Sequence, residues 1–190
     1  MLHQILQFFL QTDIDLFIFL NQHHNHFFDV IMTFVSGKYS WAPLYAFILF
    51  IIFKRFKFKK GLVVFFSIIF LIALSDQTSV YLFKNTFLRL RPCFNSEIAS
   101  FVHTVRMPGG KYGFISSHAS NAFALAIFTI MIFKNNLFTI LILLWAILIA
   151  YSRIYLGVHY PADVTAGALW GAFLASLIFF LLKKYILKKN

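Results

Sequence analysis

The sequence predicts an all-α fold, an integral-membrane helical bundle of five or six spans with N-terminal interfacial helices. The first observation is composition: of 190 residues, 61% are hydrophobic, 12% are charged and 27 are Phe. Soluble proteins are about 45–50% apolar and about 25% charged, and a short soluble chain buries only part of its surface. The second observation is that the apolar residues form long segments with almost no charge. A soluble globular fold and a disordered chain are both excluded, and a single domain over residues 1–190 is expected.

Five segments that almost lack charge are the predicted spans. They are residues 39–53, 61–83, 116–133, 137–152 and 164–182. A helix needs roughly 17–25 residues to cross the hydrocarbon core, so flanking residues must complete the shorter segments.

The first 38 residues contain no clean span. They begin with a short apolar stretch, and a second one follows Asp13 and Asp15. They lack the basic segment and the small-residue cleavage site of a signal peptide. We expect residues 1–38 to form helices in the outer interface, and a sixth span that starts near Phe27 and merges with residues 39–53 stays open.

The net charge of +11 is distributed unevenly along the chain. Five alternating spans place ten basic residues and no acidic residue on one side, which the positive-inside rule makes cytoplasmic together with the C-terminus. Those ten are Lys54, Arg55, Lys57, Lys59, Lys60, Lys134, Lys183, Lys184, Lys188 and Lys189. In a soluble protein this charge would suggest nucleic acid, whereas here it indicates orientation in the inner (plasma) membrane, and no nucleic-acid partner is expected.

Polar residues cluster where three spans meet the opposite, non-cytoplasmic face. Polar groups at membrane depth are costly, so they are candidates for function. They are Lys84 and Arg91 after the second span, Ser116, Ser117 and His118 at the start of the third, and Arg153, His159 and Asp163 between the fourth and fifth. Small residues, among them Gly167 and Gly171, follow Asp163 at steps of four and predict a closely packed helix face.

These residue types suit phosphate chemistry. Arginine forks match phosphate oxygens, lysine adds a point charge, and the start of a helix presents free backbone N–H groups to an anion. The spacing of His159 and Asp163 lets the carboxylate hold the Nδ1–H group of the imidazole and leaves Nε2 as a nucleophile. His118 is a second imidazole that can protonate a leaving oxygen.

The same residues resemble the motifs of the type 2 phosphatidic acid phosphatase and vanadium haloperoxidase superfamily. Residues 84–92 match its first motif in full (Lys, six residues, Arg-Pro), and residues 152–163 match its third (Ser-Arg, five residues, His, three residues, Asp). The second motif, Pro-Ser-Gly-His, is matched only at Ser116 and His118, because Ile115 and Ser117 replace the Pro and the Gly. The resemblance covers about residues 61–182, the motif-bearing core.

The resemblance implies a helical bundle that hydrolyses phosphomonoesters or diphosphates without a metal or other cofactor. It implies that His159 is the nucleophile and forms a phospho-histidine, that Asp163 is its partner, and that His118 acts first as acid and then as base. The implied phosphate ligands are Lys84, Arg91, Arg153, Ser116 and the backbone at Ser117. The two departures are expected to alter rate or preference without abolishing activity, and the Ser117 hydroxyl is a candidate additional donor.

The favoured function is therefore a membrane lipid phosphatase at the outer leaflet, with undecaprenyl diphosphate, converted to undecaprenyl phosphate, as the first substrate. The alternatives are lipid A and then phosphatidate or phosphatidylglycerophosphate. A transporter of phospholipids that does not cleave them is the rival from another class, and a haloperoxidase is disfavoured because the family examples are soluble. The expected partners are the lipid phosphate and the bilayer, and the oligomeric state stays open.

Other polar residues are expected to be structural or solvated. Three histidines near the N-terminus (His23, His24 and His26) lack partners spaced for a metal site. Asp76 is expected to make a structural polar contact. The charges of the loop after the second span are expected to face solvent, with contact to a second phosphate or a lipid headgroup as the alternative; they are Arg89, His103, Arg106 and Lys111. Whether Ser120 and Asn121 orient His118 stays open.

Overall fold

The computed structural model describes residues 1–187, and this part of the chain is all-helical. The elements are α1 (Leu2–Asn21), α2 (His26–Val35), α3 (Ala42–Arg55), α4 (Phe58–Thr78), the π-helix η1 (Ser79–Lys84), α5 (Asn85–Phe87), the 3₁₀ turns η2 (Pro92–Phe94) and η3 (Ala99–Phe101), α6 (Ser117–Phe133), α7 (Asn136–Tyr155) and α8 (Pro161–Leu187). The predicted all-α class is confirmed.

Local sequence explains where several helices begin. The side chains of Asn25 and Asn135 accept hydrogen bonds from backbone N–H groups in the first turns of α2 and α7. Ser116 does the same at the start of α6, through the N–H group of Ala119. Pro161 is the first residue of α8. The Asn and Ser side chains satisfy backbone N–H groups that a helix leaves unpaired at its start. Proline has no backbone N–H group, so it leaves none unpaired at that position.

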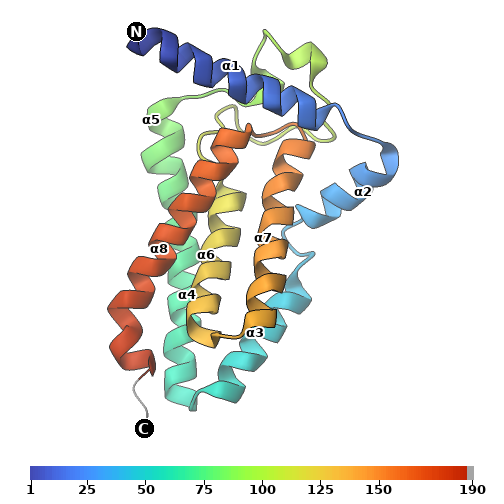
Figure 1. The fold of residues 1–190 in the computed structure, drawn as a ribbon. Helices are drawn as coiled ribbons and strands as arrows, with labels where there is room; N and C mark the ends of the chain where they lie inside the picture. The colour runs from blue at the N-terminus through green and yellow to red at the C-terminus, as the bar shows by residue number, and fades with distance from the viewer. Residues whose placement is uncertain (188–190) are drawn as a thin grey trace.

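Four helices, α4, α6, α7 and α8, form the bundle. Three helical segments of the described chain are long and apolar enough to cross a membrane: Phe58–Phe87, Asn136–Tyr155 and Pro161–Tyr185. The shorter α6 packs against α4, α7 and α8 and is the most enclosed of the four (Figure 1). A helix enclosed by neighbours is expected to be largely apolar, and α6 is so after its first turns, which carry His118, Ser120 and Asn121.

The contact between α6 and α8 depends on two glycines. A Cβ atom on Gly167 would lie 2.5 Å from the backbone oxygen of Ser116, and one on Gly171 would collide with the backbone oxygen of Ser120. Small residues allow two helix backbones to approach this closely in a membrane. The prediction that the small-residue face of the last span packs inward is therefore confirmed.

The three N-terminal helices pack around the bundle, with α2 against α7 and α3 against α4. Figure 1 shows α1 crossing the end of the bundle where α7 ends and α8 begins. Its Phe17 is fully buried and packs edge to face on Tyr160, with ring centroids 5.4 Å apart. The next two helices, α2 and α3, are separated by residues 36–41, so they do not form one continuous helix. Their depth in a bilayer stays a prediction.

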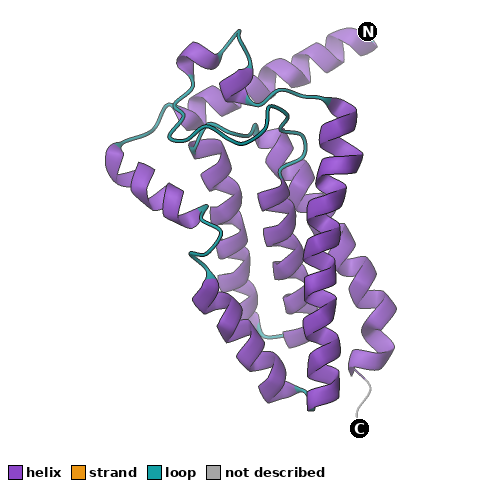
Figure 2. Ribbon diagram, turned by 180° about the vertical axis from the view of Figure 1, so that it is seen from behind, coloured by secondary structure: helices purple, strands orange, loops and turns teal. Residues whose placement is uncertain are grey.

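The basic residues gather at the opposite end of the bundle. Lys54 and Arg55 end α3, Lys134 follows α6, and Lys184 lies in the last turn of α8, all far from α1 (Figure 1). Lys188 and Lys189 lie outside the described residues. The bundle thus has one strongly basic end and one end that carries the long loops (Figure 2).

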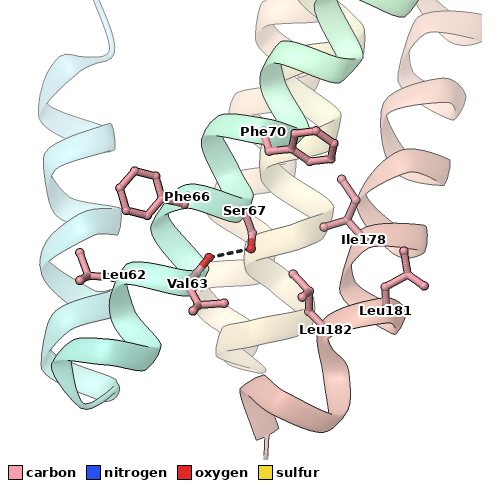
Figure 3. A pocket seen from close by; sticks show the side chains of 8 residues that line it. All are labelled: Leu62, Val63, Phe66, Ser67, Phe70, Ile178, Leu181 and Leu182. Atoms are coloured by element: carbon pink, nitrogen blue, oxygen red, sulfur yellow. Dashed lines mark hydrogen bonds between the residues drawn. The ribbon is translucent and has the colours of Figure 1, made fainter.

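An apolar groove of about 470 Å³ lies between α4 and α8, near the basic end (Figure 3). Its lining residues are Leu62, Val63, Phe66, Ser67, Phe70, Ile178, Leu181 and Leu182. The hydroxyl of Ser67 donates to the backbone oxygen of Val63, 2.6 Å away, so its proton is already used within α4. The groove suits hydrocarbon and holds none of the residues with candidate chemistry.

Candidate active site

The predicted polar residues meet at the loop end of the bundle, beneath α1. Lys84 ends η1, Ser117 and His118 begin α6, and Arg153 lies in the last turn of α7. Arg91 and His159 are supplied by the loops between these helices. Alternating helix direction is what brings residues from four sequence regions to one end.

His159 is held between a carboxylate and a guanidinium. Its Nδ1 atom lies 3.3 Å from Oδ2 of Asp163, and its Nε2 atom lies 2.9 Å from Nη1 of Arg91. A guanidinium donates hydrogen bonds and accepts none, so Nε2 is the acceptor and Nδ1 carries the proton. The proton therefore points to Asp163, and Nε2 is the nitrogen with a lone pair.

The electrostatic surroundings keep His159 neutral. Its side chain is 2% exposed. Burial, followed by the cations of Arg91 and Arg153, lowers the pKa of His159 well below its ordinary value. A neutral imidazole is the form able to act as a nucleophile.

The backbone around Asp163 fixes its carboxylate. The N–H group of Tyr160 donates to Oδ2 of Asp163 over 3.1 Å, inside the turn that opens α8. The N–H group of Ser116, at the start of α6, donates to the backbone oxygen of Asp163 over 2.9 Å. The starts of α6 and α8 are thereby joined at the site.

Gly113 lies directly over the His159–Asp163 pair, and sequence reasoning missed it. A Cβ atom at this position would lie 2.8 Å from Oδ2 of Asp163 and 3.4 Å from Nδ1 of His159. The loop can pass this close only because glycine has no side chain. Three residues of the same loop, Gly109, Gly110 and Gly113, look alike in sequence, and the first two have open space around them.

Two arginines bring unused donors into the site. The Nε groups of Arg91 and Arg153 are buried and make no hydrogen bond within the described chain. Their other contacts orient them: Nη1 of Arg91 also lies 3.2 Å from the backbone oxygen of Val158, and Nη1 of Arg153 donates to the hydroxyl of Ser36. Buried donors normally find an acceptor, and phosphate oxygens suit guanidinium N–H groups.

Lys84 is held by the serine that departs from the family motif. Its Nζ atom donates to Oγ of Ser117 over 2.7 Å. Oγ of Ser117 lies 2.5 Å from Oγ of Ser79, which donates to the backbone oxygen of Asp76. The ammonium group of Lys84 only donates, so Ser117 accepts from it. The single proton of Ser79 goes to the Asp76 oxygen, so the hydroxyl of Ser117 donates to Ser79. The Ser117 hydroxyl therefore donates to Ser79 in this structure, and its role as a donor to phosphate stays a prediction.

Ser116 and His118 differ in accessibility. Ser116 is fully buried and its hydroxyl caps its own helix, 3.5 Å from the N–H group of Ala119. His118 is exposed and lies close enough to Arg153, His159 and Lys84 to interact with them electrostatically. His118 is therefore the site imidazole that a substrate can reach from outside.

The open question about the residues after His118 is decided by their contacts with α4. Oγ of Ser120 lies 2.7 Å from Oγ of Ser75, and the amide of Asn121 donates to Asp76 over 3.4 Å. Ser120 and Asn121 therefore tie α6 to α4. The structural polar contact expected for Asp76 is confirmed.

Two loop residues that were expected to be solvated are not. The side chain of Arg89 is 20% exposed and forms ion pairs with Asp163 and with Asp13 of α1. His103 bonds to Asp29 over 2.8 Å and stacks on His24. The prediction was wrong for both, because the loop turns inward under α1. Arg106 and Lys111 are exposed, as expected.

Comparison with known proteins shows the family to which this chain belongs. Residues 61–186 match the model of the PAP2 superfamily. The chain belongs to the PAP2 superfamily. It is accordingly a membrane phosphatase, a hydrolase of phosphoric esters or anhydrides, and the sequence motifs pointed to the right family.

Three PAP2 relatives illustrate the similarity. The chain is 40% identical to a lipid A 4'-phosphatase of Bacteroides thetaiotaomicron over 95% of this chain and 81% of that protein. It is 32% identical to an undecaprenyl-diphosphatase of Sulfolobus acidocaldarius over 87% of this chain and 76% of that protein. The crystal structure of Aquifex aeolicus LpxE superposes with a TM-score of 0.65 at 26% identity, covering 88% of this chain and 94% of that one.

Proposed function

We propose that this protein removes a terminal phosphoryl group from a membrane lipid through a phospho-histidine at His159, without a metal. The observation that carries the proposal is the arrangement around His159: a carboxylate on Nδ1, an arginine beside Nε2, and further cations close by. This combination activates a nucleophile and neutralises a phosphate in the same place.

Binding of the phosphoryl group is assigned to the cations. The buried Nε groups of Arg91 and Arg153 supply donors without partners, and Lys84 supplies a third positive charge. Ser116 and the backbone at Ser117 lie at the start of α6, where helix N–H groups favour an anion. Together these groups stabilise the charge that develops on the phosphoryl oxygens in the transition state.

The reaction then proceeds in two displacements. Nε2 of His159 forms a bond to phosphorus as the bond to the leaving oxygen breaks, and His118 gives that oxygen its proton. The imidazole becomes positively charged, and Asp163 stabilises it. Water next attacks phosphorus, His118 takes up a proton from it, and the P–N bond breaks to release inorganic phosphate.

Among substrates we favour the 4'-phosphate of lipid A, which departs from the sequence-based preference for undecaprenyl diphosphate. The support is the 40% identity to a lipid A 4'-phosphatase, against 32% to an undecaprenyl-diphosphatase. Undecaprenyl diphosphate is the second candidate, because the chain is also 32% identical to an undecaprenyl-diphosphatase. Both are large amphiphiles whose phosphate reaches the membrane surface.

The distribution of charge supports the orientation. The basic residues of the α3–α4 junction and the end of α8 lie opposite the site (Figure 1). The positive-inside rule makes that end cytoplasmic, so the site faces the non-cytoplasmic side of the plasma membrane and the C-terminus lies in the cytoplasm. Residues 1–38, with α1 across the site, are assigned to the outer interface as part of a single domain over residues 1–190.

The test is phosphate release by the purified protein in detergent with EDTA present. Lipid A, undecaprenyl diphosphate and phosphatidate are supplied side by side, and fastest release from lipid A is expected. Release from none of them would favour a phospholipid transporter. A phosphoenzyme should be trapped by acid quench in the wild type and be absent from His159→Ala. Reporter fusions at Lys57 and Glu97 test orientation, and an external Lys57 would overturn it.

A further inference from the structure

We propose that Arg89 is a positioning residue: it fixes the Asp163 carboxylate that serves His159, and Asp13 of α1 fixes Arg89 in turn. The N-terminal helix is thereby a working part of the active site. This inference rests on the proposed function of the His159–Asp163 pair.

Asp163 gives one carboxylate oxygen to Arg89 and the other to His159 and the backbone N–H group of Tyr160. Oδ1 accepts a hydrogen bond from Nη1 of Arg89 over 2.8 Å, while Oδ2 faces Nδ1 of His159. The carboxylate is fully buried, and a buried carboxylate requires a partner of opposite charge. Arg89 supplies that charge from the side away from the nucleophile, so it fixes the rotation of the carboxylate without competing for Oδ2.

Arg89 is itself anchored by α1. Its Nη2 atom donates to Oδ2 of Asp13 over 2.6 Å. The other oxygen of Asp13 accepts a hydrogen bond from the N–H group of Ala162 over 2.8 Å, in the first turn of α8. A carboxylate of α1 thus caps the helix that carries Asp163, a favourable place for negative charge. The side chain of Asp13 therefore binds both the guanidinium of Arg89 and the start of α8.

An aromatic ring fixes the plane of the guanidinium. Cζ of Arg89 lies 4.1 Å from the ring centroid of Tyr160, the residue directly after His159. The same ring packs on the buried Phe17 of α1, and its hydroxyl accepts from Asn95 over 3.3 Å. Arg89 is therefore constrained by two carboxylates and one ring, which is the geometry of a preorganised support.

Charge and burial agree with this geometry. Although burial alone would lower it, the neighbouring Asp163 and Asp13 raise the pKa of Arg89, so the guanidinium stays charged. A solvated loop charge would show neither the two ion pairs nor the stacked ring. Arg106, in the same loop, is exposed and provides the contrasting case.

The test compares Arg89→Gln, Arg89→Lys and Asp13→Asn, with Arg106→Gln as the matched control, using the lipid phosphate that the wild type hydrolyses fastest. An orienting partner typically contributes roughly 10- to 100-fold, so Arg89→Gln should lower kcat by that factor and change KM by less than about threefold. Arg89→Lys should recover part of kcat. Arg106→Gln should match the wild type. An unchanged kcat in Arg89→Gln, or in Arg89→Lys where Arg89→Gln does not fold, would overturn the inference.

The link through α1 has its own readout. Asp13→Asn should lower kcat by about threefold or more, and combining it with Arg89→Gln should add little, because both changes act through one chain of contacts. Fully additive losses, or an Asp13→Asn protein with wild-type kcat, would contradict the role of α1. A wild type that hydrolyses no lipid phosphate refutes the proposed function instead, so the two failures are distinguishable.

Discussion

Nη1 of Arg91 lies 2.9 Å from Nε2 of His159, and this contact decides which nitrogen of the ring carries the proton. Because the guanidinium is the donor, the ring proton sits on Nδ1, where Asp163 faces it. The tautomer is thus set from both sides of the ring.

Asp163→Asn tests the role of the carboxylate. The change keeps the size of the side chain and removes the charge that stabilises the imidazolium. We expect kcat to fall by roughly 10³- to 10⁴-fold, the loss typical of a triad acid. Steady-state hydrolysis of the best lipid phosphate measures it. Asp15→Asn, on the exposed part of α1, is the control and should keep wild-type kcat. A loss below tenfold in Asp163→Asn contradicts the assignment.

His159 should remain neutral in weakly acidic solution. Its pKa is lowered by burial and by Arg91, so protonation begins below the ordinary value of about 6.5. The lone pair of Nε2 therefore stays available as the pH falls from about 7.5 to about 6.5. ¹⁵N NMR of the detergent-solubilised protein should show Nδ1 protonated and Nε2 unprotonated at the lower pH, with His159→Asn identifying the signal. An imidazolium signal there would refute this.

Ser117→Ala tests the anchoring of Lys84. The variant removes the only hydrogen-bond acceptor that the described residues give to Nζ of Lys84. A hydrogen bond to a charged group contributes about 1.5–3 kcal/mol, and phosphate recovers part of this, so kcat/KM should fall about 5- to 10-fold. Ser67→Ala, in the apolar groove of Figure 3, is the matched control and should leave kcat/KM unchanged. Equal activity of the two variants would mean that Ser117 does not order Lys84.

Gly113→Ala tests the close passage of the loop over the pair. The new Cβ atom meets Oδ2 of Asp163 at 2.8 Å, so the carboxylate or the loop must shift. A displacement of about 1 Å in a catalytic group costs on the order of 10²-fold in rate, and we expect a loss of that size in kcat. Gly109→Ala is the control, because nothing lies within 4 Å of its Cβ position. Similar kcat values for both variants would show that the site tolerates the shift.

Composition and hydropathy were enough to predict an all-helical membrane bundle, and the motif spacing predicted which polar residues gather at one end of it. Successive apolar helices alternate in direction, so polar residues at the ends of the second, third and fourth predicted spans were expected to meet at one face. Lys84, His118 and Arg153 do so, and the lengths of the helices decide it. The basic residues identified the opposite end by the same argument.

The contacts of the long loop and of α1 could be found only in the folded chain. Arg89 meets Asp13 and Asp163, residues more than 70 positions away in either direction, and Gly113 meets Asp163 across a loop without periodicity. Period and spacing specify which face of a helix a residue occupies, but they do not specify the path of an irregular segment. That path is set by packing under α1, which is why a loop arginine became a partner of the Asp163 carboxylate.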